Sequence, residues 1–209
     1  MKSFCVSVLV TIITFTLLFI ADTPEAGAAT VVGPGAKITP TLVYEGHCTL
    51  AALGYNNSGE LIALTAAHCS NNEPVGAPMY LYGSKQLLGH MVVINKALDY
   101  MVIKVAPGIV PSSVGGGVKV DRVAPPVRLF QVGCKSGQAS GVTCGASVPS
   151  GNLVRSFAYM TKGDSGGPYV VGTGLAGITV RIDWAVPPFT AVSIQAVLRD
   201  YGKGFTPVR

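Results

Sequence analysis

Short apolar stretches alternate with turn-forming residues along most of the chain. Clear examples are "ELIALTAA" (60–67), "HMVVIN" (90–95), "YMVIKV" (100–105), "PVRLFQVG" (126–133) and "LAGITVRI" (175–182). Most of these stretches are about four to eight residues long, and Gly, Pro, Asn or Ser lie around them. Such a pattern is typical of the many short strands of an all-β sandwich or barrel.

One segment near the C-terminus has helical spacing instead. Apolar residues in "TAVSIQAVLRDYG" (190–202) recur at intervals near those of a helix. Thr190 is a suitable N-cap, and Gly202 is suited to end a helix. The pattern therefore predicts a single helix at the end of an otherwise β-rich chain.

A break in the strand pattern lies at "PGIVPSSVGGG" (107–117), where Pro, Ser and Gly predominate. This composition favours a connector over a strand. The connector separates two parts of similar length, which we predict to be two β-domains. Their predicted bounds are residues 30–112 and residues 113–209, and the second domain includes the terminal helix.

The N-terminal segment has a different character from the rest. Lys2 precedes an apolar run over residues 4–21, and small residues follow it. This arrangement predicts a cleaved signal peptide at residues 1–29, with cleavage near Ala28 or Ala29. An uncleaved anchor is the alternative, because the apolar run is barely long enough to span a membrane. The mature protein is accordingly expected to be secreted, or held at the cell envelope if the segment stays.

The charge of the chain gives no sign of a nucleic-acid partner. Only 12% of its residues are charged, and the formal net charge is +5. The basic residues are scattered singly and are not interleaved with aromatic residues, so we expect no nucleic-acid binding.

The cysteines indicate disulfides. Cys5 lies in the predicted signal peptide, which leaves an even set of Cys48, Cys69, Cys134 and Cys144. An even set in an exported chain favours two disulfides, and the spacing alone leaves three pairings open. No CxxC spacing typical of zinc sites is present, so we expect no metal and no cofactor.

Three motifs carry groups suited to acyl transfer. "LTAAHCS" contains His68, "ALDYMVIKV" contains Asp99, and "GDSGGP" contains Ser165. A serine hydroxyl becomes a useful nucleophile when an imidazole accepts its proton and a carboxylate orients that imidazole. His47 and His90 stand in no such motif, and we expect them to be structural or exposed.

The glycines of "GDSGGP" suit the same chemistry. Glycine permits backbone conformations in which two neighbouring N–H groups point at one spot. We expect the N–H groups of Gly163 and Ser165 to stabilise the oxyanion that forms during acyl transfer, an effect worth several kcal/mol.

"TAAHC", "LDYMVIKV" and "GDSGGP", in that order, resemble the motifs of the chymotrypsin-like serine proteases. "GHCTLAALGYNNSGELIALTAAHC", "GCKSGQASGVTCG" and "LRDYG" are similar to segments of the compact bacterial branch, the streptogrisin and α-lytic-protease type. The resemblance implies two packed six-stranded antiparallel β-barrels, an N-terminal and a C-terminal one, with the site in the cleft between them. It also implies the disulfides Cys48–Cys69 and Cys134–Cys144.

The resemblance further implies an ion pair that orders the site. In larger relatives a freed N-terminus pairs with the aspartate before the nucleophile, which here is Asp164. In the bacterial branch an internal arginine does so, and Lys135 stands at the matching place. We expect a partly buried Lys135–Asp164 pair that makes zymogen cleavage unnecessary, although lysine lacks the bidentate fork of arginine.

The predicted substrate pocket lacks a counter-charge for a basic residue. Tyr159 stands six residues before Ser165, where a trypsin-like enzyme has an aspartate. Val180, Arg181 and Ile182 lie on the strand expected to line the other side. Their bulk predicts a small or medium apolar P1 residue, or a restricted pocket.

These features together predict a secreted serine endopeptidase that acts on protein or peptide substrates through an acyl-enzyme. We expect a monomer with no membrane contact after signal cleavage. An exported protease-like binding protein with weak or no peptidase activity is the alternative. An esterase with little peptidase activity is a further one, because the same acyl-transfer site serves both reactions.

Overall fold

The computed structural model describes residues 29–43, 46–183 and 186–209. These residues form mainly β-strands, with one 3-10 helix (η1) and one α-helix (α1), which confirms the all-β class. The elements in chain order are β1 (Thr30–Val32), β2 (Lys37–Thr39), β3 (Cys48–Thr49), β4 (Ala52–Tyr55), β5 (Leu61–Thr65), η1 (Ala67–Ser70), β6 (Pro78–Leu81), β7 (Leu87–Asn95), β8 (Tyr100–Val105), β9 (Ile109–Pro111), β10 (Val114–Gly115), β11 (Val118–Lys119), β12 (Arg122–Val123), β13 (Val132–Gly137), β14 (Gly141–Ser150), β15 (Leu153–Ser156), β16 (Pro168–Val171), β17 (Gly174–Ile182), β18 (Phe189–Ser193), α1 (Ile194–Tyr201) and β19 (Thr206–Pro207).

The strands of the C-terminal part close into a barrel. Their order is β17-β16-β13-β14-β15-β18, and a further pairing of β17 with β18 completes the ring. The six neighbouring pairs in this ring are all antiparallel. Residues from Gly174 to Val180 of β17 are all buried, because this strand lies against the interior of the barrel and against the other sheet.

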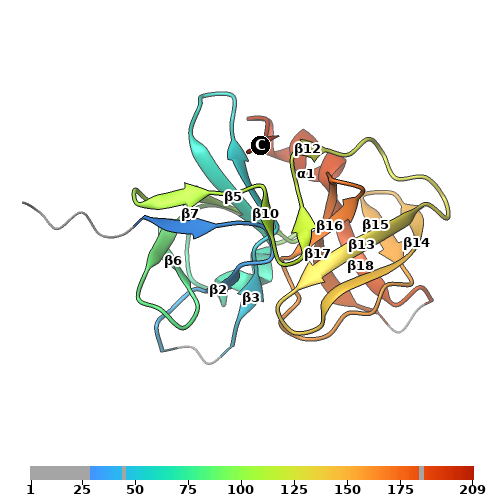
Figure 1. Cartoon of the computed structure of the whole chain (residues 1–209), viewed down its shortest axis with the longest axis horizontal. Helices are drawn as coiled ribbons and strands as arrows, with labels where there is room; N and C mark the ends of the chain where they lie inside the picture. The colour runs from blue at the N-terminus through green and yellow to red at the C-terminus, as the bar shows by residue number, and fades with distance from the viewer. Residues whose placement is uncertain (1–28, 44–45, 184–185) are drawn as a thin grey trace, which may run out of the picture.

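The N-terminal part forms a second curved sheet with the order β19-β4-β5-β8-β7-β6-β2-β3. Among the described residues this sheet remains open. Figure 1 shows the two parts side by side, with the N-terminal strands on the left and the C-terminal barrel on the right. β19, near the end of the chain, returns to the first sheet, where Thr206 pairs with Tyr55.

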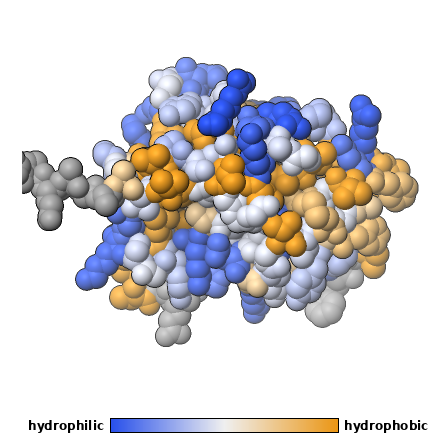
Figure 2. Space-filling model, in the orientation of Figure 1, coloured by the Kyte–Doolittle hydropathy of each residue, from blue (hydrophilic) through white to orange (hydrophobic). Residues whose placement is uncertain are grey.

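The hydrophobic core joins the two parts. One buried cluster contains Leu64 and Met101 of the first sheet together with Leu175 and Ile178 of the barrel. A smaller cluster around Tyr169 and Phe189 fills the barrel itself. On the face shown in Figure 2, hydrophobic and hydrophilic residues are interspersed.

The terminal helix begins later than predicted. Residues 190–193 belong to β18, and α1 starts at Ile194, with Ser193 accepting a hydrogen bond from the Gln195 N–H. Thr190 is therefore not the N-cap, because pairing with β15 and β17 holds this stretch in the barrel. The end of the helix is as predicted, since Gly202 adopts a φ of 67° there.

The predicted connector is also more ordered than its composition indicates. β9 and β10 lie within residues 107–117. β9 pairs in parallel with β1, so this segment is tied to the start of the described chain. The division into domains at residues 112 and 113 stays a prediction.

Two disulfides are present, Cys48–Cys69 and Cys134–Cys144. They are the pairs that the resemblance implies. The second joins directly opposite residues of the β13–β14 hairpin. Cys5 and the rest of the predicted signal peptide up to residue 28 lie outside the described residues, and no helix in the described ranges is long and apolar enough to cross a membrane.

The core position of Leu64 gives a direct test of this packing. Leu64 is 0% exposed, whereas Leu129 is 60% exposed. Leu64→Ala is expected to lower the free energy of unfolding by about 2–5 kcal/mol, because it removes buried contacts and leaves a cavity. Leu129→Ala, the matched control, is expected to change it by less than about 0.5 kcal/mol. Urea unfolding of both variants measures the difference, and equal effects would contradict the packing.

Candidate active site

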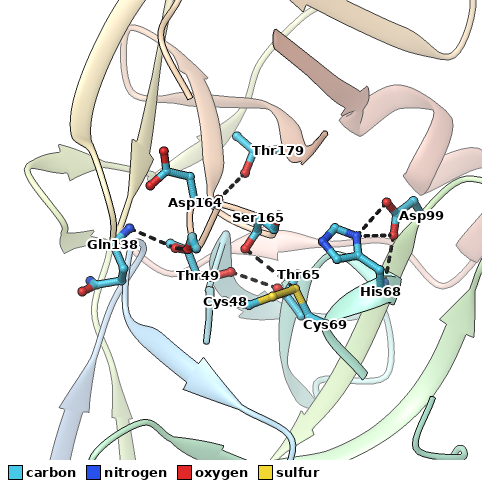
Figure 3. The surroundings of a disulfide bond; sticks show 11 residues. Cys48, Thr49, Thr65, His68, Cys69, Asp99, Gln138, Asp164, Ser165 and Thr179 are labelled. Atoms are coloured by element: carbon cyan, nitrogen blue, oxygen red, sulfur yellow. Dashed lines mark hydrogen bonds and ion pairs between the residues drawn. A yellow bond between two sulfur atoms is a disulfide. The ribbon is translucent and has the colours of Figure 1, made fainter. Parts of the chain in front are cut away.

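His68 and Asp99 lie side by side at the edge of the first sheet. His68 is on η1, which follows β5, and Asp99 immediately precedes β8. Nδ1 of His68 is 2.9 Å from Oδ2 of Asp99 and 3.1 Å from Oδ1, and the His68 backbone N–H also donates to Oδ1. Figure 3 shows the imidazole between Asp99 on one side and Ser165 on the other. A carboxylate held against Nδ1 favours the tautomer that leaves Nε2 free to accept a proton.

The turn that carries Asp99 is held from both ends. Asp99 has a φ of 57°, an uncommon conformation for a residue with a side chain. The Asn95 side chain accepts hydrogen bonds from the N–H groups of Ala97 and Leu98 inside this turn. Asp200 of α1 accepts hydrogen bonds from Asn95 and from the Tyr100 hydroxyl, each at 2.6 Å. The terminal helix thereby fixes the residues on both sides of Asp99.

The surroundings keep Asp99 ionised. Partial burial by itself would raise the pKa of Asp99, but hydrogen bonds and charge from His68 outweigh it and hold the pKa below its ordinary value. The carboxylate is therefore available to stabilise a protonated His68 near neutral pH.

Ser165 lies in the loop between β15 and β16, against the first sheet. Its carbonyl accepts a hydrogen bond of 2.8 Å from the Thr49 N–H. Gly166 follows with a φ of 84°, and a Cβ there would lie 2.0 Å from Oγ1 of Thr65, so only glycine fits. Ser165 and His68 line one pocket of about 520 Å³. Within the described residues no hydrogen bond joins the Ser165 hydroxyl to His68.

The two backbone N–H groups expected to form the oxyanion hole are available. In the part of the chain that the structure describes, neither the Gly163 N–H nor the Ser165 N–H has an acceptor. Gly163 has a φ of 97°, which glycine adopts readily. The Gly163 carbonyl accepts a 2.8 Å hydrogen bond from the Thr49 hydroxyl, which limits rotation of the Gly163–Asp164 peptide group.

Lys135 and Asp164 lie directly behind this loop. Nζ of Lys135 is 2.8 Å from Oδ2 of Asp164, and both side chains are 0% exposed. Asp164 also accepts hydrogen bonds from the N–H groups of Ala139, Ser140 and Thr161. Several donors thus surround one buried carboxylate, which fixes the backbone next to Ser165.

The charge on Asp164 survives its burial. Burial would raise the pKa of Asp164, but hydrogen bonds from Lys135 and Ser140, together with backbone donors, outweigh this and lower the pKa below its ordinary value. Ser140 hydrogen-bonds to both ions, so it links the pair to the β13–β14 turn.

The four residues predicted to form the substrate pocket are not all together. Val180 and Arg181 line a cavity of about 740 Å³ that also includes His68 and Asp99. Tyr159 and Ile182 are 65% and 51% exposed and line neither this cavity nor the pocket of Ser165. Ile182 is the last residue of β17 and Tyr159 lies in the loop after β15, and sequence position alone could not show where these side chains point.

His47 lies nearer to the site than its lack of a motif indicated. It lines the pocket that contains Ser165, and a Cβ on Gly163 would be 2.7 Å from its Nε2. Partial burial, followed by the charge of Lys37, lowers the pKa of His47 below its ordinary value. A neutral imidazole is therefore favoured beside Ser165, and the only sequence signal for it is its place just before Cys48.

Thr49 was also missed by the sequence analysis. This residue of the first sheet contacts Gly163 and Ser165, as described above, and its hydroxyl accepts a hydrogen bond of 3.0 Å from the Gln138 N–H. Figure 3 shows Thr49 beside the disulfide and next to Asp164. A threonine after a cysteine carries no recognisable pattern, so only the folded structure indicates its position.

The described residues offer no sign of a metal centre. The only group of candidate ligands among them is Cys48, His68 and Cys69, and its two cysteines are joined in a disulfide. Disulfide sulfur lacks the thiolate charge that metal binding requires.

Comparison with known structures identifies the fold. Protease A of Thermobifida fusca is 18% identical, with a TM-score of 0.66, over 86% of this chain and 99% of that one. The chymotrypsin of Cellulomonas bogoriensis is 21% identical, with a TM-score of 0.64, over 85% of this chain and 98% of that one. A glutamic-acid-specific serine protease, described as using a histidine triad in substrate binding, is 23% identical. Its TM-score is 0.66, over 84% of this chain and 100% of that one.

No protein-family model matches the sequence, and no curated protein sequence does. The structural matches span nearly the whole of each neighbour, so the chain has the complete fold of a chymotrypsin-like serine protease. Within that class it resembles the compact bacterial enzymes.

The buried Lys135–Asp164 pair makes the free energy of unfolding depend on pH in the acidic range. The native pKa of Asp164 is below its unfolded value of 3.8, so this group stabilises the fold above that pH. Its contribution is lost as the pH falls through the lower, native pKa. Asp164→Asn is expected to cost about 3–5 kcal/mol at pH 7, because it leaves Lys135 buried without its counter-charge.

Unfolding by urea between pH 7 and pH 2 measures this prediction. The stability of Asp164→Asn should fall less steeply below pH 4 than that of the unaltered protein. Asp121→Asn is the matched control, since Asp121 is a surface carboxylate whose pKa is also lowered. Its removal should have a much smaller effect at pH 7, and an equal effect would contradict the role of the buried pair.

Proposed function

We propose that this chain is a secreted serine endopeptidase that cleaves protein or peptide substrates through an acyl-enzyme. The observation that carries the proposal is the convergence of three features at one pocket. They are His68, which Asp99 contacts from the far side, the Ser165 hydroxyl, and the N–H groups of Gly163 and Ser165, which have no acceptor among the residues that the structure describes.

In this proposal the Ser165 hydroxyl attacks the substrate carbonyl while His68 accepts its proton. Asp99 stabilises the imidazolium, and the N–H groups of Gly163 and Ser165 bind the oxyanion. His68 then gives the proton to the leaving amine, and the acyl-enzyme forms. Water repeats the sequence, with His68 again accepting and returning a proton, and releases the acid.

An extended peptide suits the surroundings of Ser165. Arg181 and Ile182 of β17 pair with β18 on one side only, within the described ranges, and the bulge at Val180 leaves that residue without a partner in the ladder there. A strand edge near a nucleophile can hold a substrate backbone by strand addition. This supports a peptide substrate over a small ester.

The charges near Ser165 support a non-tryptic preference. The described lining of its pocket contains no carboxylate, whereas it contains Lys162 and His47. A substrate Arg or Lys would find no counter-charge there. The exposed Tyr159 stands where a trypsin-like enzyme has an aspartate. We keep the prediction of a small or medium apolar P1 residue.

The Lys135–Asp164 pair supports a site that is ordered without proteolytic activation. Both ions come from the mature C-terminal part of the chain, and no freed N-terminus is needed to complete the pair. Export is supported by the two disulfides, since such bonds persist in oxidising compartments.

A protease-like binding protein is the second candidate. The observation in its favour is that no hydrogen bond joins the Ser165 hydroxyl to His68 within the described residues. Catalytic hydrogen bonds are often longer before substrate binds, so this observation does not outweigh the convergence at the pocket.

A fluorophosphonate probe, which reacts covalently with an activated serine, separates the two candidates. The unaltered protein is expected to be labelled, and Ser165→Ala is expected to be unlabelled, because the variant lacks the nucleophile. His68→Ala should lose labelling by at least about 100-fold, because the general base is removed. Absence of labelling in the unaltered protein would overturn the proposed function and favour the binding protein.

The ion pair gives a second activity test. Lys135→Met is expected to lower kcat/KM for a peptide ester by at least about 100-fold, because the oxyanion hole loses its order. Lys135→Arg is the matched control and should keep most of the activity, since arginine restores the charge. Circular dichroism establishes that each variant is folded. Full activity of a folded Lys135→Met variant would contradict the role of the ion pair in ordering the oxyanion hole.

A further inference from the structure

A second cavity adjoins the catalytic groups. It measures about 740 Å³ and includes His68 and Asp99 but not Ser165. The pocket of about 520 Å³ that contains Ser165 also includes His68. The imidazole therefore lies between two hollows, and a substrate residue in the larger one is a neighbour of the residue under attack.

The lining of the larger cavity is basic. Lys96, from the turn before β8, and Arg181, from the end of β17, bring two cations. Asp99 is the only carboxylate in its described lining, and His68 engages both oxygens of that group. A ligand in this cavity therefore meets the ammonium group of Lys96 and the guanidinium of Arg181, whose charge Asp183 partly balances, and no unpaired carboxylate of the described lining.

The cavity also holds hydrogen-bond donors that the protein itself does not use. In the described part of the chain, Nζ of Lys96 and the side-chain amides of Asn71 and Asn72 have no partner. Among the described residues Arg181 donates only from Nε, to Asp183, and its two terminal nitrogens have no partner there. Ammonium, amide and guanidinium donors are the groups that bind a carboxylate.

Arg181 is held in place from behind. Asp183 accepts a hydrogen bond of 2.8 Å from Nε of Arg181 and others from Arg155 and Thr190. Burial opposes its charge, but these partners lower the pKa of Asp183 to about 2. The carboxylate of Asp183 is thus ionised at neutral pH and orients the guanidinium of Arg181. Asp183 itself does not line the cavity.

We propose that this cavity selects an acidic side chain in the substrate, with Lys96 and Arg181 as the specificity-determining residues. The inference rests on the proposed peptidase function and adds a substrate class to it. The acidic residue lies close to the scissile bond, because His68 lines both hollows, and it is not the P1 residue, because Ser165 lies outside the cavity.

Matched peptide substrates test the selectivity. Each peptide carries Glu or Gln at one position from P4 to P3′, with P1 held constant. For at least one position other than P1, kcat/KM should be about 5- to 10-fold higher with Glu, since the two cations are partly exposed and solvent weakens each contact. The preference should shrink between 20 mM and 500 mM NaCl, because salt screens exposed charges.

Two variants locate the source of the preference. Lys96→Gln and Arg181→Gln should each reduce it, and the double variant should abolish it. Lys104→Gln is the matched control, because Lys104 is an exposed lysine of β8 that pairs with Glu60 outside the cavity. It should leave the preference unchanged. Equal rates for Glu and Gln peptides, or a preference that persists in the double variant, would overturn the proposal.

Binding to Ser165→Ala separates this proposal from the proposed function. Fluorescence anisotropy of a labelled Glu peptide should report binding about 5- to 10-fold tighter than that of its Gln partner, and the Lys96 and Arg181 substitutions should remove the difference. If this binding difference is found but the fluorophosphonate probe does not label the unaltered protein, the acid-selective cavity is retained and the proposed peptidase function is rejected. Citrate added at the same concentration as the peptide should not displace it. Full displacement by citrate would indicate a site for small anions and overturn the proposal of a peptide-selective cavity.

Discussion

The buried ion pair between Lys135 and Asp164 is the interaction on which the site depends. Both side chains are fully buried, so the cost of removing two charges from water must be met by their attraction and by the surrounding donors. Those donors are backbone N–H groups and the Ser140 hydroxyl of the β13–β14 turn. The pair therefore restrains the backbone next to Ser165.

A second constraint is the contact between the two halves. Thr49 of the first sheet hydrogen-bonds to the Gly163 and Ser165 carbonyls of the second, and Asp200 of α1 reaches back to Tyr100 beside Asp99. The loop with Ser165 is thus attached to the half that carries the His68 imidazole. The proposed catalysis requires precise placement of the reacting groups, so these cross-links matter to it as well as the groups themselves.

Much of the fold could be predicted from local pattern. Short alternating strands, turn residues and the Gly202 helix end depend on neighbours in sequence, and the structure contains them. The start of the helix could not be predicted from the sequence, because pairing with β15 and β17 overrides the helical spacing of residues 190–193. The strand pairing within residues 107–117 could not be predicted either, because its partner β1 lies far away in the chain.

The sequence by itself determined which residues are candidates for the chemistry, since His68, Asp99, Ser165, Lys135 and Asp164 stand in short motifs whose residue types suit acyl transfer. Only the tertiary structure decided what surrounds them. It placed a pair of bulky residues expected at the pocket on the surface, and it set Lys96 and Arg181 around one cavity beside Asp99. The physical reason is that bond geometry and local conformation act over a few residues, whereas a cavity is formed by side chains that meet only when the sheets pack.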